Sequence, residues 1–256
     1  MKAKKSLGQN FLVDNNIIKK INDSISATKE DLIIEIGPGM GALTKELKNK
    51  EANIICYEID KDMIPYLNRL VDNKTNVIHQ DILSANIKED IKNIKYNRLF
   101  IVGNLPYYIT TSIIKFLINE NLPIYEMIFM VQEEVADRFT ANYGNKDYGS
   151  ISLFLKYHFN LEKLFKVSKK CFNPVPKVES AIIKFSDRID KPVVNKEKYF
   201  KLINDSFKMK RKTLKNNLTE YDFNKIRKIL DKYNLPDTVR AEELSENIFI
   251  DITNYL

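Results

Sequence analysis

The chain has 256 residues, of which 44% are hydrophobic, 11% aromatic and 29% charged, a balance typical of a folded globular protein that excludes a mainly disordered chain. Lys and Arg number 41 against 34 Asp and Glu, which gives a net charge of +7 and a pI near 9.1 and favours a polyanionic partner. Two cysteines and two histidines, none at the spacing of a metal site, exclude a disulfide scaffold and a zinc enzyme.

The first half of the chain alternates between strand and helix patterns. Residues 9–12 predict an arm that leads into a helix beginning near Asn15. Short runs rich in β-branched residues predict strands over Leu32–Ile36, Asn53–Tyr57, Asn76–His79, Leu99–Val102 and Glu126–Val131. Apolar residues at helical spacing predict helices over Ala42–Lys50, Lys61–Val71 and Thr111–Asn119. This alternation predicts an α/β fold with a Rossmann-like, mainly parallel sheet.

The second half ends in a helical region. A pair of strand patterns, Leu161–Val167 and Ser180–Phe185, predicts an antiparallel edge to the sheet. Helix patterns follow over Lys196–Met209, Leu214–Asn217, Tyr221–Tyr233 and Glu246–Tyr255. We therefore expect an α/β domain of residues 1–187 and a small all-helical domain of residues 188–256, and residues 191–256 hold 14 basic and 10 acidic side chains. No run has the length of a signal-peptide core or a membrane span, so we expect a cytoplasmic protein with no membrane partner.

Three glycines, Gly37, Gly39 and Gly41, follow the first long strand and open a helix. A plain strand-to-helix turn is one interpretation. The other is a cofactor site at Gly37 and Gly39, because glycine lets the backbone turn sharply and approach a ligand. Glu58 favours the second, since it stands 21 residues after Gly37 at the end of the next strand, where a carboxylate reaches ribose hydroxyls.

The neighbouring carboxylates favour S-adenosylmethionine over a dinucleotide. Glu35 precedes the first glycine by two residues, and an anion is unfavourable beside a pyrophosphate. S-adenosylmethionine has no phosphate and carries an ammonium and a sulfonium that favour nearby carboxylates. Asp81, after the next strand, is placed to accept a hydrogen bond from the adenine amine, although a helix cap is an equally good interpretation of this residue alone.

The sequence Asn104-Leu105-Pro106-Tyr107 ends another strand. A simple turn is the alternative, but the residue types suit methyl transfer to an adenine amine. If the Asn104 amide oxygen and the Leu105 carbonyl accept the two amine hydrogens, the nitrogen lone pair is directed at the sulfonium methyl. Tyr107 is then placed to stack on a base flipped out of its stack.

Two further features extend this site. Phe172, held before Pro174 and Pro176, is a candidate to face Tyr107 across the base, with an ordinary core position as its alternative. A basic run in the helical region is either a solvated face or a set of phosphate contacts. Its candidate RNA-binding residues are Lys208, Lys210, Arg211, Lys212 and Lys215.

Together these motifs resemble the ribosomal RNA adenine dimethyltransferases, and within them the KsgA-type enzymes of the small subunit. The blocks that carry the resemblance span nearly the whole chain in the family's order: KSLGQNFLVD, IEIGPGMGALT, GNLPYYIT, FMVQEEVADR, YGSISLF, FNPVPKVESAIIKF, FKMKRKTLKNNL and RAEELS.

The resemblance implies a class I methyltransferase fold and S-adenosylmethionine as methyl donor. It implies dimethylation of two adjacent adenines near the 3′ end of small-subunit rRNA, by a monomer acting on a pre-30S-type particle. It also implies residue roles: Asn10 and Leu12 cover the cofactor, Gly37 lines it, Glu58 holds the ribose and Asp81 the adenine. Asn104 serves both the cofactor and the target amine, with Tyr107 and Phe172 flanking the base.

Four other functions are weaker interpretations. A large-subunit rRNA adenine methylase shares the cofactor and target turns, but the basic run and RAEELS favour the small-subunit branch. A DNA adenine methylase usually has Asp-Pro-Pro-Tyr where this chain has Asn104 to Tyr107. A non-catalytic assembly factor does not need the intact Glu58, Asp81 and Asn104. An NAD oxidoreductase conflicts with the carboxylates around the glycine turn.

Overall fold

The computed structural model describes residue 4 and residues 7–187 and 192–256. The chain divides into two compact units. One holds the residues up to Ala136 together with Glu162–Asp187, and the other holds Asp137–Leu161 together with the residues after 187. One division therefore falls at the expected boundary, but residues 137–161 group with the helical unit and not with the α/β unit.

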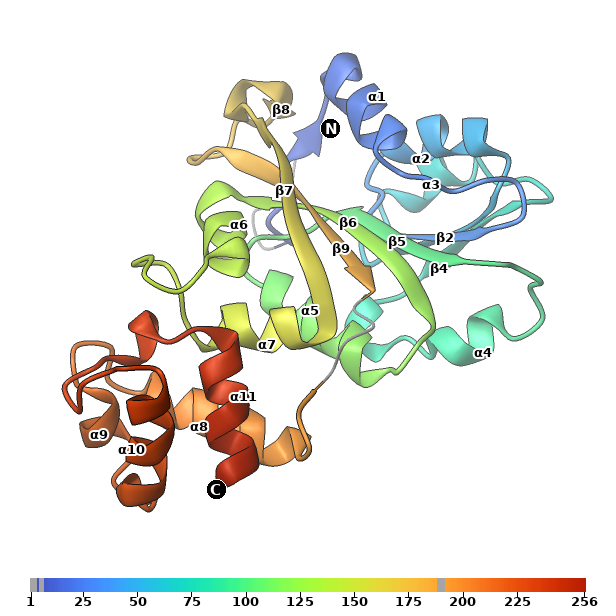
Figure 1. The fold of residues 1–256 in the computed structure, drawn as a ribbon. Helices are drawn as coiled ribbons and strands as arrows, with labels where there is room; N and C mark the ends of the chain where they lie inside the picture. The colour runs from blue at the N-terminus through green and yellow to red at the C-terminus, as the bar shows by residue number, and fades with distance from the viewer. Residues whose placement is uncertain (1–3, 5–6, 188–191) are drawn as a thin grey trace. The chain divides into compact units, whose positions relative to one another are not determined.

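The first unit is built on one twisted sheet (Figure 1). Among the described residues the sheet has seven strands, in the order β4-β3-β2-β5-β6-β9-β7. Their bounds are β2 (Leu32–Ile36), β3 (Asn53–Glu58), β4 (Thr75–His79), β5 (Leu99–Asn104), β6 (Ile124–Gln132), β7 (Phe159–Val167) and β9 (Ser180–Asp187). Strands β2 to β6 pair in parallel, and β9 pairs antiparallel with β6. The predicted mainly parallel sheet with an antiparallel edge is confirmed.

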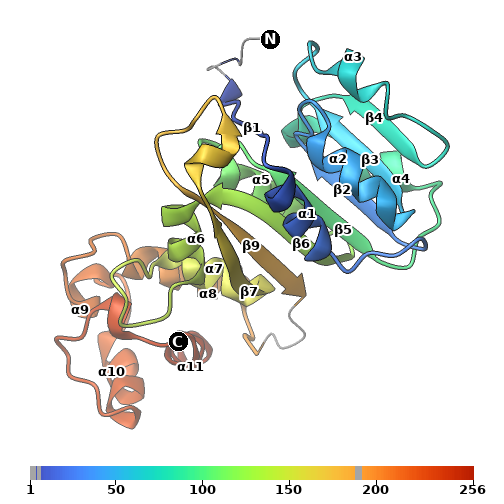
Figure 2. The same cartoon turned by 90° about the horizontal axis from the view of Figure 1, so that it is seen from above.

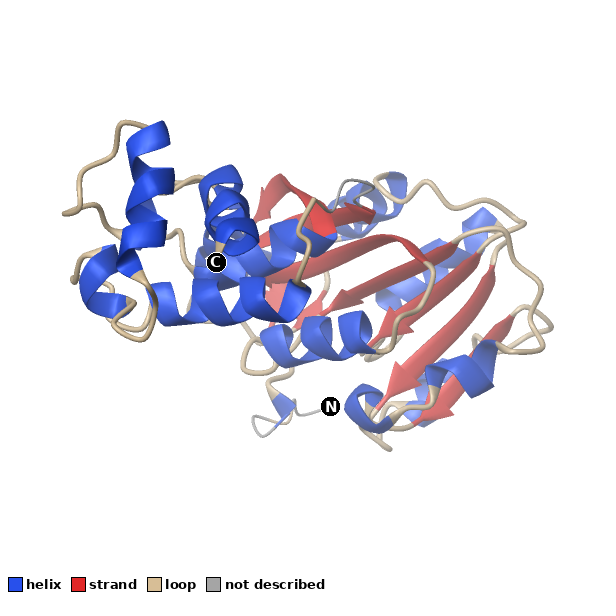
Figure 3. Cartoon of the chain, turned by 60° about the horizontal axis from the view of Figure 1, so that its bottom comes forward, coloured by secondary structure: helices blue, strands red, loops and turns tan. Residues whose placement is uncertain are grey.

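Helices α1 and α2 lie on one face of this sheet, and α4 and α5 lie on the other (Figures 1 and 2). All five residues of β2 are buried, as expected for a parallel strand covered on both faces. Figure 3 shows the strands in red with the helices along them in blue. The helical segments that begin in this unit are α1 (Asn15–Asp23), α2 (Ala42–Leu47), η2 (Lys48–Lys50), α3 (Ile64–Leu67), η3 (Ile82–Ser84), α4 (Ile87–Ile91), α5 (Thr110–Asn119), α6 (Glu133–Thr140) and η4 (Lys169–Cys171).

The helix predicted over Lys61–Val71 is mostly wrong, because only α3 within it is an α-helix. Turns surround it, and Pro65 occupies its first turn. The apolar spacing that suggested a long helix is met by a short helix flanked by turns, which together bury Met63 and Leu67.

A small second sheet pairs two distant segments of the first unit. Strand β1 (Phe11–Leu12) lies antiparallel to β8 (Phe172–Asn173), with Leu12 opposite Phe172. This pairing holds the N-terminal arm, which we define as residues 4 and 7–12, beside the carboxyl ends of the parallel strands (Figure 2). The strand order changes direction at β2, whose neighbours are β3 and β5, and ligands bind at such a point in open α/β sheets.

The second unit is helical. Its segments are α7 (Ser150–His158), α8 (Lys196–Ser206), α9 (Leu214–Asn217), α10 (Phe223–Lys232), η5 (Ala241–Glu243) and α11 (Glu246–Tyr255). Leu153 and Tyr157 of α7 belong to the same buried apolar cluster as Tyr199, Leu230 and Phe249. This shared core explains why residues 137–161 group with the C-terminal helices, which helical periodicity alone does not reveal.

Candidate functional site

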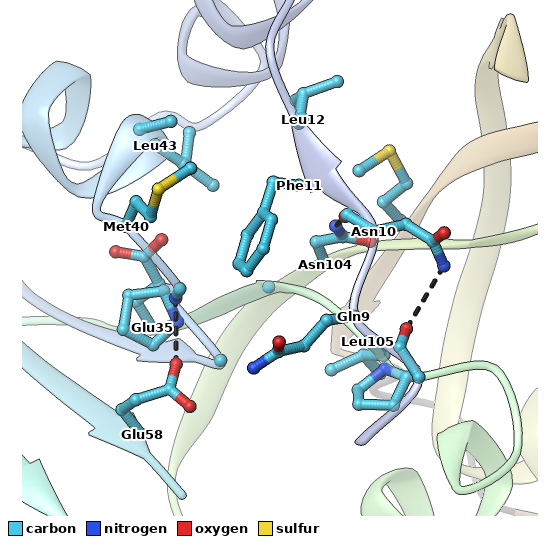
Figure 4. Close-up of a pocket in the computed structure, with 18 of the residues that line it drawn as sticks. Gln9, Asn10, Phe11, Leu12, Glu35, Met40, Leu43, Glu58, Asn104 and Leu105 are labelled. Atoms are coloured by element: carbon cyan, nitrogen blue, oxygen red, sulfur yellow. Dashed lines mark hydrogen bonds between the residues drawn. The ribbon is translucent and has the colours of Figure 1, made fainter. Parts of the chain in front are cut away.

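A pocket lies at the carboxyl ends of β2, β3 and β5, and all its walls belong to the first unit (Figure 4). Eight of the ten residues predicted to bind the cofactor or the target base line it: Asn10, Leu12, Gly37, Gly39, Glu58, Asn104, Leu105 and Tyr107. The other two, Asp81 and Phe172, do not. The structure therefore brings the glycine turn, the Glu58 carboxylate and the Asn104 turn around one space.

The glycine turn needs its residue type. Gly37, Gly39 and Gly41 all have positive φ angles, of 67°, 59° and 81°. A Cβ on Gly39 would also lie 3.1 Å from the ring of Phe11, which points into the pocket (Figure 4). Any other residue at Gly39 would strain the backbone and press on this ring.

Glu58 is a buried carboxylate held by the backbone. It is 4% exposed, and its two oxygens accept the N–H groups of Gly39 at 2.9 Å and Asp60 at 2.8 Å (Figure 4). Burial raises the pKa of Glu58 above its usual value, and the two backbone hydrogen bonds oppose that rise. The result is an acceptor fixed at the pocket wall, which suits a ligand that donates hydroxyl or amine hydrogens.

Glu35 forms another part of the pocket wall. Its side chain is buried, accepts a hydrogen bond from the Thr44 hydroxyl at 2.6 Å, and has the Cys56 thiol 3.7 Å away. Burial raises the pKa of Glu35 to about 7. A ligand phosphate beside this acid would be unfavourable, whereas a ligand cation would stabilise its charged form.

Asn104 ends β5, and its side-chain NH₂ donates to the carbonyl of Asn10 at 2.9 Å. The preceding Gly103 lets β5 approach β2 closely, because a Cβ there would lie 2.5 Å from the carbonyl oxygen of Ile36. Leu105 is 1% exposed, and its N–H donates to the carbonyl of Met130. The turn is therefore fixed to strands on both sides before any ligand binds.

Tyr107 is anchored at its far end. Its hydroxyl lies 2.8 Å from the hydroxyl of Ser180, which is fully buried at the start of β9. Burial raises the pKa of Tyr107, so this phenol stays neutral at neutral pH. The ring lines the pocket while its hydroxyl is turned into the protein, an arrangement suited to stacking and not to proton transfer.

Phe172 lies away from the pocket. It is 2% exposed and belongs to the buried cluster that includes Leu12, Ile18 and Val167. Its place opposite Leu12 in the β1–β8 pair turns the ring into this core. The structure thus shows the core position that was the alternative interpretation, and stacking on a base remains a prediction.

Asp81 also serves a local role here. Its carboxylate accepts the N–H of Leu83 at 3.0 Å and caps the short helix η3. This is again the alternative expected from sequence, and a contact to adenine remains a prediction. Asp81 does follow β4, at the same sheet edge as Glu58.

The residues of the site that sequence did not single out include Gln9, Phe11 and Ser180. Gln9 and Phe11 line the pocket from the arm, and Ser180 holds Tyr107. The arm carried a usable signal, because a Gln-Asn-Phe-Leu segment before a helix has polar and aromatic groups with no core role of their own. Ser180 carried none, since its contact joins a turn and a strand whose residues are 73 positions apart in the chain.

The five predicted RNA-binding cations are all exposed in the second unit: Lys208, Lys210, Arg211, Lys212 and Lys215. Lys208 is paired with Asp205 at 2.8 Å, and Lys210 donates to the carbonyl of Lys146. Lys215 stands 5.5 Å from the ring centre of Phe223. In the described part of the chain, Arg211 and Lys212 have no ion-pair or hydrogen-bond partner through their side chains.

Asn217 supports the basic loop before α9. It is 9% exposed and binds both backbone groups of Met209, accepting from its N–H at 3.0 Å and donating to its carbonyl at 3.2 Å. The loop that carries the cations is thus tied to the core of the helical unit.

The described residues offer neither a membrane-spanning helix nor a cluster of metal ligands. None of the described helices has both the length and the apolar character needed to cross a membrane. Within residues 4, 7–187 and 192–256, no three His, Cys, Asp or Glu side chains are grouped to hold a metal ion.

Comparison with known proteins bears on the whole chain. The family model described as ribosomal RNA adenine dimethylase matches residues 1–256. A protein of Pediococcus pentosaceus called ribosomal RNA small subunit methyltransferase A is 39% identical over 267 residues, covering 99% of this chain and 90% of that protein. A Clostridioides difficile protein of the same description is also 39% identical, covering 100% and 91%. The crystal structure of the 23S rRNA methyltransferase ErmE has a similar fold, with a TM-score of 0.78, 24% identity and coverage of 96% and 99%.

Proposed function

Because the chain belongs to the ribosomal RNA adenine dimethylase family and is therefore an rRNA adenine dimethyltransferase, we propose that it uses S-adenosylmethionine to dimethylate two adjacent adenines near the 3′ end of small-subunit rRNA. The observation that carries the proposal is that Glu58 and the Asn104–Tyr107 turn line the same pocket. A methyl donor and a target amine must meet within one space for transfer to occur.

The polar groups that line the pocket fit S-adenosylmethionine. Glu58 offers fixed acceptor oxygens to ribose hydroxyls, and Glu35 offers a carboxyl to a cationic ligand. The arm residues Asn10 and Leu12 would cover the bound molecule, and Asp81 would reach its adenine. When bound, S-adenosylmethionine supplies a methyl group on a positively charged sulfur.

The chain's own contribution to transfer is positioning. The Asn104 side-chain oxygen and the Leu105 carbonyl accept the hydrogens of the target amine and orient its lone pair. Tyr107 offers a ring face to the flipped base, and Phe172 would have to leave its core position to oppose it. No separate base is required, because the methylated amine is cationic and loses a proton readily.

The basic loop of the helical unit supports an RNA substrate. Arg211 and Lys212 are exposed cations on a loop tied down by Asn217. Such groups contact phosphates without reading sequence. We assign the small subunit on the names of the relatives, and we propose that the enzyme acts as a monomer on a pre-30S-type particle.

The test is methyl transfer to separated ribosomal subunits. Small and large subunits lacking the modification are incubated with the enzyme and labelled S-adenosylmethionine, and the labelled nucleotides are mapped. We expect label on two adjacent adenines near the 3′ end of the small-subunit rRNA. Label on large-subunit rRNA would contradict the proposed substrate, and label elsewhere in the small subunit would contradict the proposed position.

A further inference from the structure

Asp60 fastens the N-terminal arm to the loop after β3. The Asp60 side chain is almost fully buried, and it accepts the Gln9 side-chain NH₂ at 2.6 Å on one oxygen and the Lys4 ammonium at 2.5 Å on the other. Lys4 returns a backbone N–H to the Gln9 side-chain oxygen at 2.8 Å. A buried carboxylate held by an amide and a cation is a specific attachment, because losing Lys4 removes its counter-charge and losing Gln9 leaves one of its oxygens without a hydrogen bond.

The attached arm reaches Asn104. Gly8 lies against the ring of Tyr108, so close that a Cβ there would be 3.2 Å from it. Two residues later the Asn10 carbonyl accepts the Asn104 side-chain NH₂ at 2.9 Å. The arm is therefore held by Asp60 at Gln9 and by Asn104 at Asn10, along the wall of the pocket that both arm residues line (Figure 4).

The Asn10 carbonyl decides which way the Asn104 amide faces. A carbonyl oxygen only accepts hydrogen bonds, so it selects the NH₂ end of the amide and leaves the side-chain oxygen free to face elsewhere. The opposite orientation would bring two oxygens together. An amine that has to donate its hydrogens needs that free oxygen.

We propose that Asp60 is a positioning residue for methyl transfer, which attaches the arm so that the Asn10 carbonyl holds the Asn104 oxygen toward the target amine. The proposal rests on the proposed function, because it assigns Asn104 the role of acceptor. It predicts that loss of the Asp60 attachment slows the transfer step, even though Asp60 contacts neither ligand.

Asp60→Asn tests this with little change of shape. The variant keeps the backbone N–H of residue 60, so the Glu58 carboxylate keeps its hydrogen bond from that group. Asp62→Asn is the matched control, because Asp62 also pairs with Lys4 at 2.6 Å but is nearly half exposed and has no contact with Gln9. Melting temperatures of both variants check that they fold.

The measurement is single-turnover methyl transfer on small-subunit particles with cofactor and substrate saturating. We expect Asp60→Asn to lower the rate by about 10- to 100-fold, since a displacement of about 1 Å costs that much, and Asp62→Asn to stay within about twofold of wild type. In an Asn104→Ala background, Asp60→Asn should cause no further loss, because both changes act through one amide. The rate of amide hydrogen exchange in residues 7–12 should rise in Asp60→Asn and stay unchanged in Asp62→Asn.

Two results would overturn the proposal: an unchanged rate in Asp60→Asn at saturating cofactor, which would limit any effect of Asp60 to cofactor binding, or an equal loss in the Asn104→Ala background. A wild-type enzyme that labels neither ribosomal subunit would instead remove the proposed function, which separates the two failures.

Discussion

A single buried carboxyl, Glu35, gives the pocket a dependence on pH. Its pKa of about 7 in the folded protein exceeds the value near 4.5 for an unfolded chain, so the folded state binds the proton more tightly. The protonated Glu35 carboxyl therefore stabilises the folded state fully below pH 4.5, and this stabilisation is lost as the pH rises through 7. We expect this group to lower the free energy of unfolding by about 3 kcal/mol between those limits.

Urea titrations of wild type and Glu35→Gln at pH 5 and pH 8 measure this effect. The neutral amide should remove the decline that wild type shows. Equal declines in the two proteins would show that Glu35 ionises normally when folded.

The hydroxyl pair of Tyr107 and Ser180 makes a second prediction about individual residues. Tyr107→Phe and Ser180→Ala each leave a buried hydroxyl without its partner, which costs about 1–3 kcal/mol of unfolding free energy. The double variant removes both groups and should cost less than the sum of the two single changes. Denaturation midpoints of the four proteins give the coupling, and strictly additive costs would mean that the two hydroxyls do not interact.

At the scale of elements, the junction of β6 and β9 contains a buried ion pair. Glu126 on β6 is 3% exposed and pairs with Lys184 on β9, which lies one diagonal step away in the register. Among the described residues, the other Glu126 oxygen has no hydrogen-bond partner. Within the described part of the chain, Lys184 is therefore the one ion-pair partner of Glu126.

Lys184→Met should lower the free energy of unfolding by about 3–5 kcal/mol, because it leaves this carboxylate buried and uncompensated. Adding Glu126→Leu removes the buried charge and should recover most of the lost free energy of unfolding. A single variant as stable as wild type would show that the pair contributes nothing to the antiparallel edge.

The success of sequence-based prediction also differed between elements. The parallel strands could be predicted because each is a short apolar run ending in turn residues, and these ends brought Gly37, Glu58 and Asn104 to one edge. The core position of Phe172 could not be chosen over a place in the site, because it depends on pairing with Leu12, which lies far away in the sequence. Helix α7 was missed for a related reason, since its apolar face packs against helices that follow much later.

At the scale of the whole molecule, the net charge of +7 is less informative than where unpaired cations lie. Arg211→Gln with Lys212→Gln should flatten the salt dependence of RNA binding by about 0.7–0.9 log unit per lost phosphate contact. Lys208→Gln is the matched control, because Asp205 already neutralises Lys208. Binding measured across a salt series should give an unchanged slope for this control. An unchanged slope for the double variant would show that Arg211 and Lys212 form a solvated face.

The pairing of β1 with β8 has a consequence for the timing of biosynthesis. Leu12 and its partner Phe172 are 160 residues apart, so at about 5–20 residues per second the arm leaves the ribosome roughly 10 to 30 s before its partner strand. The strands that carry Glu58 and Asn104 are made within that interval, before Phe172. Until Phe172 is made, Asp60 and Asn104 can hold the arm but its strand pairing cannot form, so the pocket is among the last parts of the first unit to be completed.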